Sequence, residues 1–252
     1  MNPTMTVSGN HEQGKIPGLL LILLHLLPGL TLYPVWLVLS HVFIQHGYTG
    51  YLALLMSIPL CLAPVELGVI LYWSRRFTGR KSLMEAVLYR RRGAAADYLW
   101  IPLLLYVCYM LLSIPLSPVS QYLESHLAIY LPSWARQAAL IAGLTASPPA
   151  QRAVALVLGV ILSGLVASIC EELYFRGFLL PRMERWGWAA PVVNALLFAI
   201  GHFYFPGSVP GVFVAFLPIS CVAMYKKDWR IGAIVHILFN LSGVFTMAYL
   251  TG

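Results

Sequence analysis

The chain has 252 residues, of which 60% are hydrophobic and only 10% are charged, and its formal net charge is +7. A soluble domain of this length exposes far more charge, so the composition excludes a soluble enzyme and indicates an all-α, polytopic integral membrane protein. The positive charge does not indicate a nucleic-acid partner, because the basic residues gather in short connections between apolar segments.

Uncharged stretches long enough to cross a bilayer predict about seven transmembrane helices. In chain order these spans are about residues 17–44, 52–73, 98–116, 153–183, 189–205, 210–225 and 231–250. The third span is expected to end at Leu116, in a proline-rich sequence. Residues 120–149 are then predicted to be extramembrane, with an interfacial helix. No internal repeat divides the chain, so we expect a single membrane domain over residues 1–252.

Basic residues predict the orientation of these spans in the membrane. Two connections are strongly basic, one with Arg75, Arg76, Arg80, Lys81, Arg90, Arg91 and Arg92 and the other with Lys226, Lys227 and Arg230. The positive-inside rule places both in the cytoplasm, with the amino terminus inside and the carboxyl terminus outside. Because the protein is small and has a single-chain layout, we expect it to lie in a bacterial plasma membrane. The polar first 15 residues lack an apolar segment with a cleavage site, so no removable signal peptide is expected.

The most informative segment is Glu171-Glu172-Leu173-Tyr174-Phe175-Arg176, which places two carboxylates and a guanidinium in an otherwise apolar span. A charge at such a depth costs roughly 2.5–3.5 kcal/mol, so it indicates either function or pairing. Glu172 and Arg176 are one helical turn apart, and we predict an ion pair between them. Glu171 points about 100° away and has no partner on its own helix, as expected of a carboxylate that acts as a base.

Two further polar patterns lie downstream, His202 in the fifth predicted span and the pair His236 and Asn240 in the seventh. The turn between the fourth and fifth spans brings Glu172 and His202 to similar depths, since both lie a similar number of residues from it. His236 and Asn240 lie in the same half of the membrane. We therefore predict that these side chains meet in one cavity, which opens toward the cytoplasmic half.

The combination of a carboxylate, histidines and an amide favours hydrolysis. A carboxylate inside a bilayer is able to take a proton from water, and a nearby histidine can orient that water. His236 and Asn240 offer two hydrogen-bond donors to a developing oxyanion. The sequence contains neither a GxSxG nor an HExxH pattern, so nothing indicates a serine nucleophile or the common helical zinc site. These features predict cleavage of a peptide bond by activated water, without a covalent intermediate.

Three motifs, EExxxR at Glu171–Arg176, FxxxH at Phe198–His202 and HxxxN at His236–Asn240, follow each other on separate predicted helices. Together they resemble the CAAX-protease and bacteriocin-processing family of intramembrane glutamate endopeptidases, also called CPBP or Abi proteins. The resemblance covers residues 150–252, the predicted catalytic core in the last four spans, whereas residues 1–149 match only as family-variable spans and loops. It implies that Glu171 activates water, Arg176 holds Glu172 beside it, His202 assists with the water, and His236 and Asn240 stabilise the oxyanion.

The expected mechanism needs no cofactor. A metal-dependent alternative would use zinc bound by Glu171, His202 and His236, although Asn240 is a poor zinc ligand. The four cysteines form no CxxC pair, which indicates neither a disulfide framework nor a thiolate zinc site. The expected partners are the lipid bilayer and a peptide or protein substrate that is membrane-embedded or lipid-tethered. The sequence leaves open whether that substrate is prenylated, and it leaves the oligomeric state open.

Two other classes of function stay in consideration. A proton-coupled transporter would use Glu171, Glu172 and His202 as a relay, but the chain shows no paired inverted repeat of the kind transporters have. A non-catalytic membrane scaffold would have no use for an unpaired Glu171. Glu66, in the second span, is a further intramembrane acid that we interpret as structural, paired with His25 or Arg176 or lining a substrate path.

Overall fold

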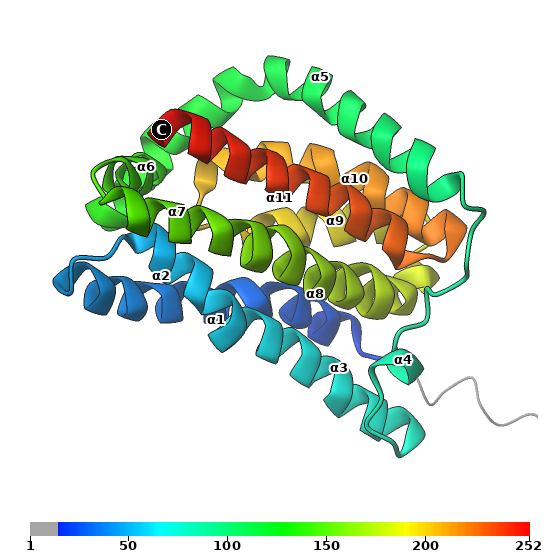
Figure 1. Ribbon diagram of the computed structural model, residues 1–252. Coiled ribbons are helices and arrows are strands. Elements are labelled where there is room, and N and C mark those ends of the chain that lie inside the picture. The colour runs from blue at the N-terminus through cyan, green and yellow to red at the C-terminus, as the bar shows by residue number, and fades with distance from the viewer. Residues whose placement is uncertain (1–14) are drawn as a thin grey trace, which may run out of the picture.

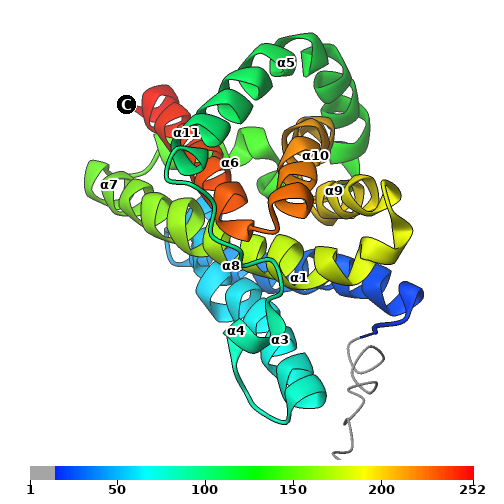
Figure 2. The same ribbon diagram turned by 90° about the vertical axis from the view of Figure 1, so that its right-hand side faces the viewer.

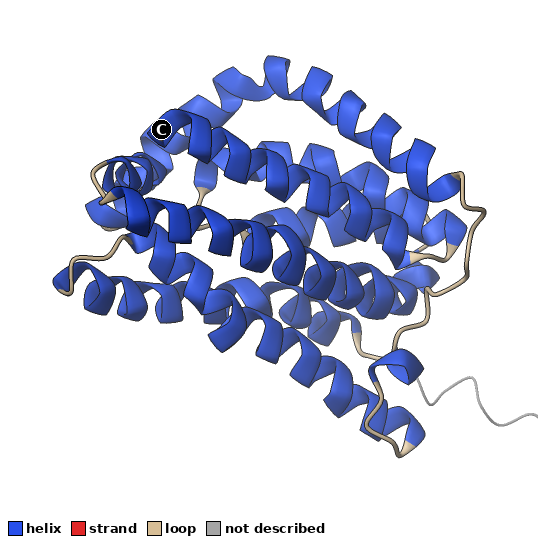
Figure 3. Cartoon of the chain, in the orientation of Figure 1, coloured by secondary structure: helices blue, strands red, loops and turns tan. Residues whose placement is uncertain are grey.

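The computed structural model describes residues 15–252, and the polar segment 1–14, where no signal peptide was expected, lies outside it. Residues 15–252 form helices joined by loops, with no β-strand among them (Figure 3). The helices are α1 (Gly18–Gln45), α2 (Gly50–Ser57), η1 (Ile58–Leu62), α3 (Ala63–Thr78), α4 (Leu83–Ala86), α5 (Asp97–Leu127), η2 (Ala128–Tyr130), η3 (Ser133–Ala135), α6 (Gln137–Thr145), α7 (Pro149–Leu158), η4 (Gly159–Ala167), α8 (Ser168–Glu172), η5 (Leu173–Leu179), η6 (Leu180–Trp186), α9 (Ala189–Gly201), η7 (Pro206–Ser208), α10 (Val209–Lys226) and α11 (Trp229–Thr251).

The prediction of an all-α polytopic membrane protein is confirmed. Six helical stretches in the described part of the chain are long and apolar enough to cross a membrane: Gly18–Gln45, Gly50–Thr78, Asp97–Tyr130, Pro149–Trp186, Pro206–Lys226 and Trp229–Thr251. The fifth predicted span, residues 189–205, falls short, because α9 has only 13 residues. Such a helix is about 20 Å long, less than the roughly 30 Å of the hydrocarbon layer.

The predicted end of the third span at Leu116 is wrong. Helix α5 passes through Pro115 and Pro118 and continues to Leu127. A proline removes one helical hydrogen bond and bends a helix, but it need not end one inside a membrane. Accordingly α5 arches over α10 and α11 (Figure 1), and Pro102 is its only buried residue. The first part of the supposed extramembrane segment therefore belongs to this helix, and the short helix α6 forms in the remainder.

Helices α1, α3, α10 and α11 pack around the stretch from Pro149 to Trp186, whereas α5 packs on α10 and α11 (Figure 2). Helix α11 packs against this stretch and against α5, while α9 lies between α10 and α1. Helices α1 and α9 cross at Gly29, where an added Cβ atom would overlap the carbonyl oxygen of Gly201. The crossing therefore requires glycine on α1.

The two strongly basic connections lie next to each other at one end of the bundle. The backbone N–H of Arg91 donates to the carbonyl of Lys227, and that of Trp229 donates to the carbonyl of Tyr89. Asp228 is fully buried and is the N-cap residue of α11, where its side chain accepts a hydrogen bond from the backbone N–H of Arg230. The carboxyl ends of α6 and α11 lie at the opposite end of the molecule (Figure 1).

Candidate active site

The two glutamates lie midway along the helical stretch Pro149–Trp186. Glu171 and Glu172 belong to α8, a short α-helical piece between two wide π-helical pieces, η4 and η5. Such π-helical turns change the direction of side chains and are frequent at functional sites. Glu172 is fully buried and Glu171 is 7% exposed, so both carboxylates have left bulk solvent.

Glu172 forms the predicted ion pair with Arg176. The Arg176 Nη1 atom lies 3.0 Å from Glu172 Oε1, and both side chains are fully buried. The guanidinium also donates from Nε to the hydroxyl of Ser220 at 3.4 Å. It stacks over the rings of Phe198 and Phe216, 4.5 and 4.8 Å from their centroids. These contacts compensate part of the cost of burying Arg176, although its Nη2 atom and Glu172 Oε2 have no hydrogen-bond partner.

His236 of α11 lies between the two glutamates. Its Nε2 atom is 3.4 Å from Glu171 Oε2, and its Nδ1 atom is 3.3 Å from Glu172 Oε1. The close approach of α11 depends on Gly232, where an added Cβ atom would overlap the carboxylate of Glu172. The missing partner of Glu171 is thus supplied by a different helix, and one imidazole connects both carboxylates.

His202 follows the last residue of α9 and points one nitrogen at its own helix. Its Nδ1 atom lies 2.9 Å from the carbonyl oxygen of Phe198. A carbonyl only accepts, so Nδ1 carries the hydrogen and Nε2 has a lone pair. Together with Glu171, His236 and Asn240, His202 lines a cavity of about 210 Å³. A water molecule there could donate to Nε2, as expected of a histidine that orients water.

Asn240 also reaches this cavity, but its amide is already engaged. The Nδ2 atom donates to the carbonyl of Ser163 and to the hydroxyl of Ser168, both at 3.0 Å. An amide has two N–H bonds, so neither is free for an oxyanion in this arrangement. Asn240 instead fixes α11 against η4 and α8. Of the two expected oxyanion donors, His236 is the one whose ring faces Glu171.

A chain of buried polar groups extends from the ion pair to α1, and the sequence analysis missed most of it. Ser220 donates to Asn194 Oδ1 at 2.9 Å. Asn194 donates to His25 Nε2 at 3.0 Å and to the carbonyl of Phe175 at 3.1 Å. His25 Nδ1 in turn contacts the carbonyl of Leu21 at 2.6 Å. A polar residue in an apolar span is a recognisable signal, and it would have identified Asn194.

Glu66 is fully buried, and neither of its carboxylate oxygens has a hydrogen-bond partner. The suggested pairing with His25 or with Arg176 is therefore wrong, because His25 bonds to Asn194 and Arg176 bonds to Glu172. Its electrostatic neighbours include Glu171 and Glu172. Glu66 therefore adds a third carboxyl group beside the site.

The suggested zinc ligands do not form a ligand cluster. In residues 15–252 no group of three or more His, Cys, Asp and Glu side chains is placed to hold one metal ion.

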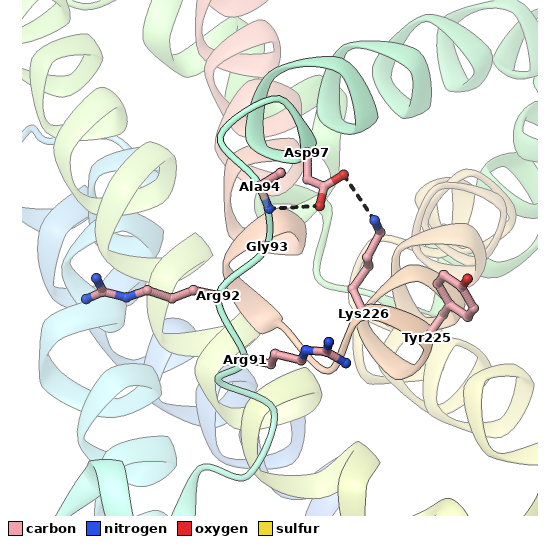
Figure 4. Close-up of a pocket in the computed structure, with 7 residues that line it drawn as sticks. All are labelled: Arg91, Arg92, Gly93, Ala94, Asp97, Tyr225 and Lys226. Atoms are coloured by element: carbon pink, nitrogen blue, oxygen red, sulfur yellow. Dashed lines mark hydrogen bonds and ion pairs between the residues drawn. The ribbon is translucent and has the colours of Figure 1, made fainter.

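Two other cavities are compared with this site, one that adjoins it and one at the basic end. One of about 260 Å³ shares Tyr51, Leu54, Ser163, Phe205 and Asn240 with the first cavity and continues to Gln137, Gly243 and Met247. A larger one of about 460 Å³ lies at the basic end and is lined by Arg91, Arg92, Gly93, Ala94, Asp97, Tyr225 and Lys226 (Figure 4). There Asp97 accepts a hydrogen bond from Lys226 at 3.0 Å. Despite its size, this basic-end pocket contains none of the predicted catalytic residues and shares no lining residue with the other two.

Residues 153–242 match the family model described as Type II CAAX prenyl endopeptidase Rce1-like. The match includes all six predicted site residues and confirms the resemblance that the three motifs carry. It supports a CAAX-type membrane protease in general. Neither the curated proteins nor the solved structures gave a match to the chain.

Proposed function

We propose that this chain is an intramembrane endopeptidase in which Glu171 activates water to hydrolyse a peptide bond. The observation that carries the proposal is the position of His236, within 3.4 Å of both Glu171 and Glu172. These groups border a cavity in the segment that matches a prenyl endopeptidase family. A base, an ordered donor and a space for substrate are therefore brought together by three helices.

In the proposed reaction, a water molecule in the cavity donates hydrogen bonds to Glu171 and to His202 Nε2. Glu171 takes a proton from the water as its oxygen attacks the carbonyl carbon of the substrate. Protonation of Glu171 weakens its contact with His236 Nε2, which then donates to the oxyanion that forms, in a site with little competing solvent. Glu171 then returns the proton to the leaving nitrogen as the C–N bond breaks, which releases a carboxylic acid and an amine.

Glu172 and Arg176 are positioning residues in this mechanism. Arg176 holds the Glu172 carboxylate, and that carboxylate faces Nδ1 of His236. We expect this contact to orient the imidazole, so that Nε2 faces Glu171. The ion pair thus lets His236 serve the reaction without adding a free charge to the site.

The test is substrate trapping in the membrane. The Glu171→Gln protein should retain a bound peptide or protein that can be cross-linked and identified by mass spectrometry. The parent protein, reconstituted in lipid vesicles, should cleave that molecule at one position, and the Glu171→Gln protein should not. If parent and variant cleave it equally, the assignment of Glu171 is wrong. If the vesicles instead show proton flux that Glu171→Gln removes, the transporter is the correct class.

A further inference from the structure

We propose that the active-site cavity receives its substrate from the extracytoplasmic face of the membrane, and that the substrate is an uncharged, apolar peptide segment exposed at that face. The inference rests on the proposed function and adds the side and the chemistry of the substrate.

The two connected cavities extend in one direction along α11. The first contains His236 and Asn240, and the second contains Asn240, Gly243, Val244 and Met247. About 16 Å of helix separate His236 from Met247. Both positions lie beyond Trp229, where α11 begins at the basic end, so the space extends away from that end. Its far part is lined by Gln137 and Leu140 of α6.

The distribution of charge decides which face this is. The two basic connections lie together at the beginning of α11 and are bonded to each other. The positive-inside rule places them in the cytoplasm, so the α6 end faces outward. This differs from the expectation of a cavity that opens toward the cytoplasmic half. That expectation followed from depth counted along helices, but the open space lies beside the loop after α9, at His202, Tyr204 and Phe205.

The residues that line the two connected cavities determine which kind of substrate can bind there. Among the described residues, Glu171 is the only Asp, Glu, Lys or Arg side chain that lines either cavity. Most of the others are apolar, such as Leu54, Phe205 and Met247, with scattered hydroxyl groups that can bond a peptide backbone. A charged residue of the substrate would lose its hydration there without a partner, which is costly. A tail approaching from the cytoplasm would meet the basic-end pocket, which shares no lining residue with these cavities.

The orientation can be tested without measuring activity. In a background with Cys108 and Cys221 replaced by serine, Gln137→Cys and Arg92→Cys are labelled with a membrane-impermeant maleimide. We expect Gln137→Cys to react in intact cells and Arg92→Cys to react only in inside-out vesicles. The reverse pattern would overturn the proposal. If the labelling is as expected but the protein shows no cleavage activity, the result counts against the proposed function and not against the orientation.

Occupation of the cavity is tested at Gly243, where an added Cβ atom would meet nothing within 4 Å. Gly243→Phe should fill the second cavity and lower cleavage of the trapped substrate by at least tenfold. Gly68→Phe is the matched control, because Gly68 is equally open and lines neither cavity. It should retain parental activity.

A second form of the test avoids any effect on folding. Gly243→Cys, in the same serine background, is allowed to fold and is then alkylated with a bulky impermeant maleimide. Cleavage should stop when the reagent is added outside and continue when it is added inside. Undiminished cleavage by Gly243→Phe, or after outside alkylation of Gly243→Cys, would contradict this route for the substrate.

Discussion

His236 is the residue on which the proposed chemistry depends most. An imidazole between two buried carboxylates has both ring nitrogens facing acceptors, with Glu171 on one side and Glu172 on the other. Arg176 pairs with Glu172, whereas the ion-pair partner of Glu171 is His236 itself. Substitutions at these residues should therefore fall into two groups, those that abolish cleavage and those that destabilise the fold.

Replacing Glu171 should remove chemistry. Glu171→Gln keeps the size of the side chain but cannot accept a proton, so cleavage should fall by about 10²–10⁴-fold, the usual contribution of a general base. The thermal midpoint of the detergent-solubilised protein should change little, because the ion-pair partner of Glu171 among the described residues is His236. A loss of activity that follows a loss of folded protein would argue against a role as base.

Replacing Arg176 should mainly remove stability. Arg176→Met leaves the fully buried Glu172 without its cation, and the free energy of unfolding should fall by about 3–5 kcal/mol. Adding Glu172→Gln should recover part of this loss, because the stranded charge is then absent. Chemical denaturation of the two single variants and the double variant measures the coupling. Simple additivity of the two single effects would contradict a stabilising pair.

At the scale of helices, the crossing of α1 and α9 is decided by one glycine. Gly29→Ala should destabilise the protein by about 1–3 kcal/mol, because its methyl group would displace the Gly201 carbonyl. Gly201→Ala is the matched comparison, since a Cβ atom there meets only the His25 carbonyl at 3.9 Å. Thermal unfolding in detergent should therefore separate the two variants. Equal midpoints would show that the helices shift apart without cost.

The sequence predicted the helices better than it predicted their ends or their contacts. The local pair Glu172–Arg176 follows from helical spacing, and the shared cavity follows from the three motifs. The course of α5 through Pro115 and Pro118 could not be predicted, because proline propensity does not account for a bent helix held by α10 and α11. The engagement of Asn240 by Ser163 and Ser168 was equally hidden, since it depends on the packing of α11 against α8.

At the scale of the whole molecule, the question of a metal has a direct test. The predicted mechanism uses only the side chains of the chain itself, so activity in vesicles should survive dialysis against a strong chelator and show no gain when zinc is added. Metal content measured on the same samples provides the control. Loss of cleavage on chelation, restored by zinc, would favour the metal-dependent alternative instead.

The membrane orientation also belongs to this scale, because it follows from where all the charges lie. Replacing Lys226, Lys227 and Arg230 with uncharged glutamine should leave the orientation unchanged, since the seven basic residues of the other connection still anchor that end. Removing both groups should produce a mixture of orientations. Labelling of Gln137→Cys from each side of the membrane reports the proportion.

The shortness of α9 has a consequence for how water reaches a bond inside lipid. The helix stops at Gly201, and Glu124 of α5 accepts the hydrogen bond of the Gly207 backbone N–H in the turn that follows. Non-helical backbone at this depth persists only where protein or trapped solvent shields it. There Tyr204 packs edge-on against Trp36, and Phe205 packs against the same ring at a tilt. His202, Tyr204 and Phe205 of this turn line the cavity together with Glu171. In the proposed mechanism, the early end of α9 therefore leaves room for water next to the general base.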